Sequence, residues 1–379
     1  MKKAKLLTAL FAVTLLGGSL AACGETGPYT VKMGLQNNMG GACGHAAVVE
    51  GFFDEYEVNV DHKILGGPQI AQNLIQGSLD VGFLGNGVAW NYFTKDSKIK
   101  IFAIDNITDD DRLLANPNSD KAKGLEEAIA NVKMDNYEEL ADALAGSTIA
   151  FDGTTTPATF FSSLVTEINS KLDDADRIWW TDNTGKKLPA TGITAYSEDR
   201  KVNVDNSVTN ANLPAMMGGD KYDFCVAFSP SAWTIQNTNK FKVVARASTH
   251  LSTDNVVPST WAYNVDFAEN HPEEFAAFLK GLVKGMDFRH DNKDKTAADI
   301  AELMAGTITK DSIDTDTGYW PTAQDQLDYT KTDGIAYKYV ENIYNNHKSG
   351  ANADKVVKAA KDVADFSYLR TACEAVLAE

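Results

Sequence analysis

Two successive strand–glycine–helix junctions between Ile64 and Trp90 constrain the fold more than any other feature of this sequence. At the first junction, a short apolar strand ends in Gly66-Gly67-Pro68 and a helix follows. At the second, a buried strand over residues 79–84 ends in Gly85-Asn86-Gly87, where another helix begins. Such successive junctions are typical of a parallel sheet, whose strand ends and helix starts share one edge. Ligands bind at this edge in open α/β sheets, so we expect the binding site there.

Residues 1–22 have the pattern of an export signal. Three lysines precede an apolar segment, residues 6–16, that is too short to span a bilayer. The following Leu20-Ala21-Ala22-Cys23 resembles a bacterial lipobox, in which the cysteine is acylated and becomes the new N-terminus. Each buried acyl CH₂ group contributes about 0.8 kcal/mol, so a multiply acylated Cys23 would stay at the membrane. We therefore expect a lipoprotein with a tether over residues 23–29, on the extracytoplasmic side of the bacterial cell envelope.

Composition and charge exclude some partner classes. The 379 residues are 44% hydrophobic and 23% charged, an ordinary globular composition that is long enough for two domains. The formal net charge of −17 argues against nucleic acid, which needs a basic surface. Apart from Cys23, the three cysteines form no Cys-x-x-Cys pair, and the histidines lack metal-ligand spacing except in the loop pair Cys43/His45. These positions predict no disulfide framework, metal site or cofactor, and we expect a monomeric protein.

A second strand–helix system begins near residue 147 and predicts a second lobe. We expect an α/β, two-lobed chain with a ligand cleft between the lobes. Lobe 1 would contain residues 30–105 and 258–379, including a helical C-terminal region, and lobe 2 residues 106–257. The stretch Trp179–Arg200 fits no regular element and is expected to be a surface excursion.

The loops that face this cleft are rich in uncharged donors and acceptors. The residues expected to bind the ligand are Gln36, Asn37, Asn38, Gly67, Gln69, Asn86, Trp90, Thr154, Thr155, Thr156, Ser229 and Trp233. The three threonines stand at a helix start, where the N–H groups and the dipole favour an anion by about 0.3–1 kcal/mol. We therefore expect a small organic anion such as a sulfonate, held by hydrogen bonds. A planar heterocycle between tryptophans is the rival ligand.

Several motifs together carry a resemblance to one known family. They are the lipobox, Gly66-Gly67-Pro68-Gln69, Gly77-Ser78-Leu79-Asp80-Val81-Gly82, Tyr222-Asp223 before Phe228-Ser229-Pro230, and His271-Pro272-Glu273. Over most of residues 30–290 the chain resembles the nitrate/sulfonate/taurine family of ABC-transporter substrate-binding proteins. This resemblance implies a two-lobed periplasmic-binding-protein fold. It also implies a receptor, not an enzyme, that closes on a small molecule and delivers it to an ABC permease in the membrane.

Two other functions stay open on the sequence alone. One is a binding protein for a thiamine-precursor-like heterocycle, and the other is an exported enzyme on the same fold. An enzyme needs a reactive constellation, and the polar cluster with reactive potential is Cys43 with His45 in a glycine-rich loop. Gly85-x-Gly87-x-x-Trp90 is close to a dinucleotide fingerprint, but Trp90 replaces the third glycine, which helix–strand packing requires.

Overall fold

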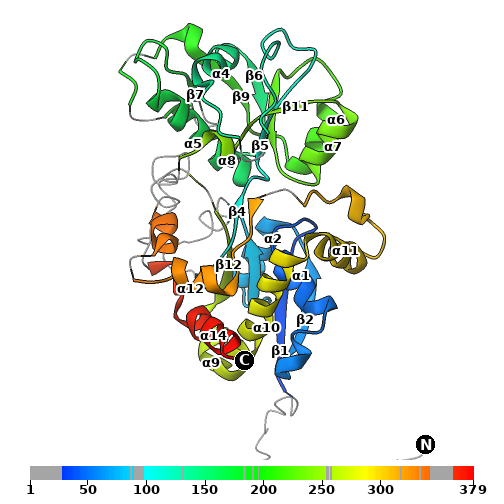
Figure 1. Ribbon diagram of the computed structural model, residues 1–379. Helices are drawn as coiled ribbons and strands as arrows, with labels where there is room; N and C mark the ends of the chain where they lie inside the picture. The colour runs from blue at the N-terminus through cyan, green and yellow to red at the C-terminus, as the bar shows by residue number, and fades with distance from the viewer. Residues whose placement is uncertain are drawn as a thin grey trace, which may run out of the picture.

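The chain forms two sheets, each flanked by helices, which appear as an upper and a lower lobe in Figure 1. This computed structural model describes residues 28–85, 88, 98–129, 132–181, 185–189, 192–194, 196–252, 256, 258–315, 318–332, 334–341 and 362–379. The signal segment, Cys23, Asn86 and Trp90 lie outside the described residues. Within the described part of the chain, no helix has both the length and the apolar character needed to span a bilayer.

Lobe 1 contains a six-stranded sheet in the order β13-β4-β12-β3-β1-β2. The strands are β1 (Thr30–Leu35), β2 (Asn59–Ile64), β3 (Val81–Leu84), β4 (Ile99–Thr108), β12 (Pro258–Asn264) and β13 (Gly318–Tyr319). As predicted, β1 pairs in parallel with both β2 and β3, and helix α2 (Gly67–Ile75) starts at the predicted glycines after β2. The carboxyl ends of these parallel strands therefore gather at one edge of the sheet.

The helices of lobe 1 bury their apolar faces against this sheet and against each other. They are α1 (Ala42–Val49), α2, α9 (Val265–Asn270), α10 (Pro272–Asp291), α11 (Lys293–Leu303), α12 (Ala323–Tyr329) and α14 (Ser367–Leu377). In α10, Pro272 opens the helix, and the apolar residues Phe275 to Met286 recur at helical spacing and are buried. Each fully buried side chain of this kind contributes about 1.5–3 kcal/mol. The predicted helical C-terminal region is confirmed.

Lobe 2 contains a seven-stranded sheet in the order β11-β5-β10-β6-β9-β7-β8. Its strands are β5 (Arg112–Ala115), β6 (Thr148–Ala150), β7 (Trp179–Thr181), β8 (Lys187–Leu188), β9 (Lys201–Asp205), β10 (Phe224–Ala227) and β11 (Lys242–Arg246). Its helices are α4 (Tyr137–Leu144), α5 (Thr156–Ser170), α6 (Leu213–Met216), α7 (Ser231–Thr238) and α8 (Ala247–His250). Short 3₁₀ turns occur at Asp54–Tyr56, Glu198–Arg200, Asn210–Asn212 and Lys310–Ser312.

The stretch Trp179–Arg200 is not the surface excursion that the sequence predicted. Strand β7 pairs in parallel with β9, and β8 pairs antiparallel with β7, so the segment extends the sheet of lobe 2. Trp179 is 1% exposed, and Trp180 packs edge-on against Phe151 in the core. The prediction failed because strands of two or three residues are too short to show alternation of apolar and polar side chains.

The chain passes from lobe 1 to lobe 2 between β4 and β5, and returns between α8 and β12. The second predicted boundary, at residue 258, coincides with the start of β12. The first, after residue 105, lies inside β4, whose residues Asn106 and Ile107 still pair with β12. We propose the predicted lobe assignment with this boundary moved to the end of β4.

Candidate ligand-binding site

Two adjacent cavities lie between the lobes at the carboxyl ends of the lobe 1 strands. The outer cavity has a volume of about 630 Å³, which lies within the range of about 300–1,000 Å³ usual for small-molecule sites. The inner cavity has a volume of about 50 Å³, and a water molecule occupies roughly 30 Å³ in the liquid. Gln36, Gly67, Thr155 and Phe228 line both cavities. The outer space can therefore hold the body of a small molecule and the inner space one of its end groups.

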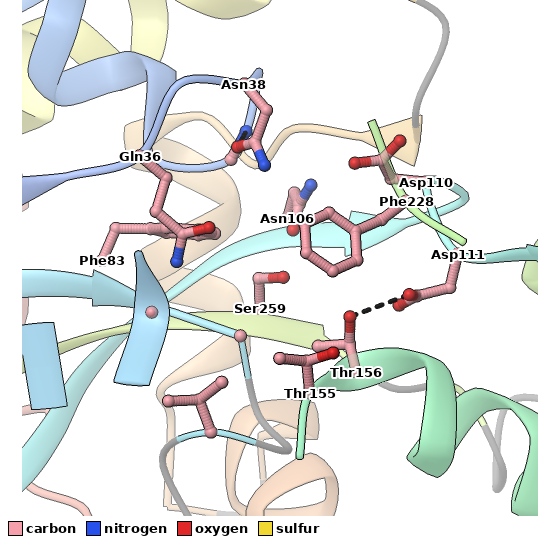
Figure 2. Close-up of a pocket in the computed structure, with 14 residues that line it drawn as sticks. Gln36, Asn38, Phe83, Asn106, Asp110, Asp111, Thr155, Thr156, Phe228 and Ser259 are labelled. Carbon is pink, nitrogen blue, oxygen red and sulfur yellow. Dashed lines mark hydrogen bonds between the residues drawn. The ribbon is translucent and has the colours of Figure 1, made fainter. Parts of the chain in front are cut away.

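Both lobes contribute to the inner cavity, which Figure 2 shows in close-up. Lobe 1 supplies Gln36, Asn38 and Gly40 after β1, Gly67 at the start of α2, Phe83, Gly85, Val88, Asn106 on β4 and Ser259 on β12. The crossing after β4 supplies Asp110 and Asp111, and lobe 2 supplies Thr155 and Thr156 at the start of α5 and Phe228 after β10. Residues far apart in the sequence thus meet because strand ends and helix starts share one edge.

Two glycines of the inner cavity permit close contacts that a side chain would prevent. A Cβ atom at Gly85 would lie 2.6 Å from Cγ2 of Thr156 in the other lobe. A Cβ atom at Gly40 would lie 2.4 Å from Cζ of Phe83, inside the same cavity wall. Since real Cβ contacts of this length do not occur, these two glycines permit the observed contact between backbone and side chains.

Seven of the predicted ligand-binding residues line the cavities: Gln36, Asn37, Asn38, Gly67, Gln69, Thr155 and Thr156. Three others lie nearby without lining them. Thr154 donates to Asp152 Oδ1 through its N–H at 3.0 Å and through its hydroxyl at 2.7 Å. Ser229 uses its backbone to bind Asp110 and Asn38. Trp233 is half-buried in α7, whose Thr234 lines the outer cavity. A ligand role for each of these residues remains a prediction.

Sequence reasoning missed the acidic side chains of the inner cavity, Asp110 and Asp111. Thr156 Oγ1 donates to Asp111 Oδ1 at 2.8 Å, and the Ser229 N–H donates to Asp110 Oδ1 at 3.0 Å. The pKa of Asp111 is raised to about 8, mainly by burial. The Thr156 hydrogen bond opposes this shift, and the charge of Asp110 adds to it. Burial also raises the pKa of Asp110. The run Asp109-Asp110-Asp111 at the predicted crossing was the available signal.

Among the described residues that line the two cavities, none is a lysine or arginine. Arg112, which follows the acidic pair, is 1% exposed and pairs with Asp314 of lobe 1 at 2.6 Å. Its Nη2 also lies 3.9 Å from Asp110. A second contact between the lobes is the hydrogen bond from Asn38 Nδ2 to the Ser229 carbonyl, at 3.2 Å. The lobes are thus in contact beside the cavity.

Cys43 and His45, the cluster on which an enzyme would depend, lie in the core of lobe 1 and not in the lining of either cavity. Both side chains are fully buried. The Cys43 thiol donates to Asp105 Oδ1 at 3.5 Å, and burial raises its pKa. Burial lowers the pKa of His45 to about 4, and its Nδ1 lies 3.4 Å from the Gly41 carbonyl oxygen. Both groups are therefore held in their neutral forms.

Known proteins share this architecture at low sequence identity. No protein-family model matches the chain. A protein of Brucella abortus (strain 2308), provisionally named as a binding protein, is 21% identical to this chain over 268 residues. The match covers 70% of this chain and 68% of that protein.

Solved structures match nearly the whole chain. The periplasmic nitrate-binding protein NrtA from Synechocystis PCC 6803 has a TM-score of 0.59 and 13% identity, over 93% of this chain and 90% of that one. The periplasmic aliphatic sulphonate binding protein SsuA from Escherichia coli has a TM-score of 0.54 and 14% identity, over 88% of this chain and 93% of that one. DszB in complex with biphenyl-2-sulfinic acid has a TM-score of 0.57 and 12% identity, over 91% of this chain and 99% of that one. Because these identities are low, the likeness concerns the fold: the chain has the two-lobed fold of the periplasmic binding proteins.

Proposed function

We propose that this chain is the solute receptor of an ABC importer, which closes on a small molecule held between its two lobes. The observation that carries this proposal is the pair of cavities lined from both lobes at the strand ends. Structural neighbours include nitrate- and sulphonate-binding proteins and a ligand-binding component of an ABC-type import system from Staphylococcus aureus, which supports the same function. One neighbour, DszB, is an enzyme, but the Cys43–His45 cluster of this chain lies outside the cavities.

Two ligand classes have support. The sequence favours a small organic anion of the sulfonate, taurine or nitrate kind, and the start of α5 does face the inner cavity through Thr155 and Thr156. A heterocycle of the thiamine-precursor kind is the second candidate. It is favoured by the aromatic rings of Phe83 and Phe228, which line the same cavity.

The location proposed for this receptor is the extracytoplasmic face of the membrane, where acylated Cys23 would anchor it beside its permease. The sequence Leu20-Ala21-Ala22-Cys23 motivates this part of the proposal. Mass spectrometry of protein extracted from membranes should find an acylated N-terminus at Cys23. A freely soluble, unmodified protein that begins at another residue would contradict the anchor and leave the receptor function untouched.

Ligand-linked closure tests the receptor function itself. Calorimetry against small anions, amines and heterocycles should identify a saturable ligand that is not consumed. At a hundred times its dissociation constant, this ligand should raise the free energy of unfolding by about 2.7 kcal/mol. Small-angle X-ray scattering should then show compaction relative to the ligand-free protein, as expected for hinge closure. Turnover of the compound, or identical scattering curves with and without a tight ligand, would contradict the proposal.

A matched pair of glycine variants connects closure to the cavity. Gly85→Ala places a Cβ atom against Thr156 of the other lobe and should weaken ligand binding at least tenfold. Gly219→Ala is the control, because a Cβ atom there meets nothing within 4 Å. Equal affinities in the two variants would show that the ligand does not require the observed approach of the lobes.

A further inference from the structure

The side chains that line the inner cavity include three acceptor groups, the carboxyls of Asp110 and Asp111 and the amide oxygen of Asn106 (Figure 2). Asn106 is 2% exposed, and its Oδ1 has no hydrogen-bond partner among the described residues. A buried carbonyl oxygen without a donor is unfavourable, because it has lost water and gained nothing in exchange. A ligand that donates a hydrogen bond at this place would satisfy it.

The threonine hydroxyls at the start of α5 already have acceptors within the protein, Asp152 O for Thr155 and Asp111 for Thr156. Thr156 Oγ1 donates to Asp111, and this carboxyl therefore lies beside the helix N-terminus that was expected to attract an anion. An oxyanion in the inner cavity would also lie beside Asp110. No lysine or arginine is among the described residues that line this cavity, and Arg112, whose Nη2 lies 3.9 Å from Asp110, is paired with Asp314. An oxyanion there would oppose ionisation of the two carboxyls, whereas an N–H donor would favour it.

We propose that the ligand places a nitrogen group with N–H donors, an ammonium or a heterocyclic amino group, between Asp110, Asp111 and Asn106 Oδ1. This inference rests on the proposed receptor function and names the end of the ligand that the inner cavity selects. Its volume of about 50 Å³ suits one such group, and the remainder of the ligand extends along Phe228 into the outer cavity.

The environment of Asp111 supports this assignment. Burial raises the pKa of this carboxyl even though it accepts the Thr156 hydroxyl, so its charged form would gain from a further donor. An N–H group, above all a cationic one, supplies the missing interaction only when the ligand is bound.

Compounds that differ only in the nitrogen group test the proposal by calorimetry on the full mature chain at pH 7. Taurine is compared with ethanesulfonate, and 4-aminopyrimidine with pyrimidine. In at least one pair the amino compound should bind at least tenfold more tightly, and the pair that shows the preference distinguishes an ammonium from a heterocyclic amine. Equal or tighter binding of the amine-free compounds would overturn the inference.

Variants then assign the preference to the acidic pair. Asp111→Asn, in which an amide donor replaces the acceptor, should reduce the preference for the amino compound at least tenfold. Asp120→Asn removes an exposed carboxylate of lobe 2 and should leave it unchanged. Should Asp111→Asn fail to melt cooperatively, Asn106→Leu provides the same test, because it removes the unpartnered oxygen. An unchanged preference in the folded variant would contradict the assignment.

This test separates the inference from the receptor function. If nitrate or ethanesulfonate binds and closes the lobes while both amino compounds do not bind, the nitrogen-donor inference is wrong and the receptor function stands. If no compound of the broad panel used for the receptor produces heat or compaction, the receptor function is contradicted as well.

Discussion

Two buried carboxyls close together in the chain, Asp105 and Asp111, have opposite surroundings. Asp105 is fully buried within β4 and is surrounded by donors. Its Oδ1 lies 2.8 Å from Arg289 Nη1 and 2.8 Å from Trp261 Nε1, and its Oδ2 accepts the Gly41 N–H at 3.1 Å. Asp111 is 3% exposed and accepts the Thr156 hydroxyl, beside a second carboxyl and an open cavity.

The difference shows which carboxyl supports the fold and which is available to a ligand. Asp105 and Arg289 form an ion pair with both side chains fully buried, which ties β4, α10 and the loop that carries Asn38 and Gly40 into one unit. Asp111 forms no ion pair with a described residue, although the charge of Arg112 acts on it, and perturbed acids of this kind in a cavity are typical of functional sites. Burial alone therefore does not distinguish the two roles; the number of nearby donors does.

The largest expected effect comes from breaking the Asp105 ion pair. Arg289→Met should lower the free energy of unfolding by about 3–5 kcal/mol, because it leaves the buried charge of Asp105 without its cation. Urea denaturation measures this change. The double variant Asp105→Asn with Arg289→Met should recover part of the loss, since neither charge then remains. A loss below about 1 kcal/mol in the single variant would show that the pair does not support the fold.

A smaller effect of opposite sign is expected at Asp111. Its pKa is about 8 in the folded chain against an ordinary 3.8, so the folded state binds the extra proton between these values. The stability of the wild type should therefore lose this contribution as pH rises from about 4 to about 8. Asp111→Asn cannot titrate and should be more stable than the wild type by about 1–3 kcal/mol at pH 8, with the difference vanishing near pH 4. Denaturation curves across this range, with Asp120→Asn as control, check the sign.

The smallest effect is expected at Cys43, whose thiol donates to the structural carboxyl of Asp105. The hydroxyl of Cys43→Ser can still donate to Asp105, so the free energy of unfolding should fall by only about 0.5–1.5 kcal/mol and ligand affinity should not change. In the native chain, a thiol reagent should not label Cys43 or the equally buried Cys225, and both should react after unfolding. Rapid labelling of native Cys43, or loss of ligand binding in Cys43→Ser, would show that this residue belongs to the functional site.

The predictions succeeded where a local pattern has only one structural outcome. The glycines after β2 and the apolar spacing of α10 each specified an element and its buried face. They failed at β7, where three residues carry too little periodicity. They also missed Asp111, because an acidic residue in a crossing segment is more often solvated than buried.

What the sequence determined by itself is the α/β class, the two sheet systems and the strand ends at which Gln36, Gly67 and Thr155 meet. These follow from local periodicity and from the rule that parallel strands share one edge. The tertiary structure alone decided which carboxyl has a cation beside it, because Arg289 reaches Asp105 from a helix far along the chain. It also decided that Asp110, Asp111 and Asn106 line one cavity, in which the described lining residues include no lysine or arginine. Charge and hydrogen bonding inside a protein depend on distances between elements, and these distances exist only after the lobes have packed.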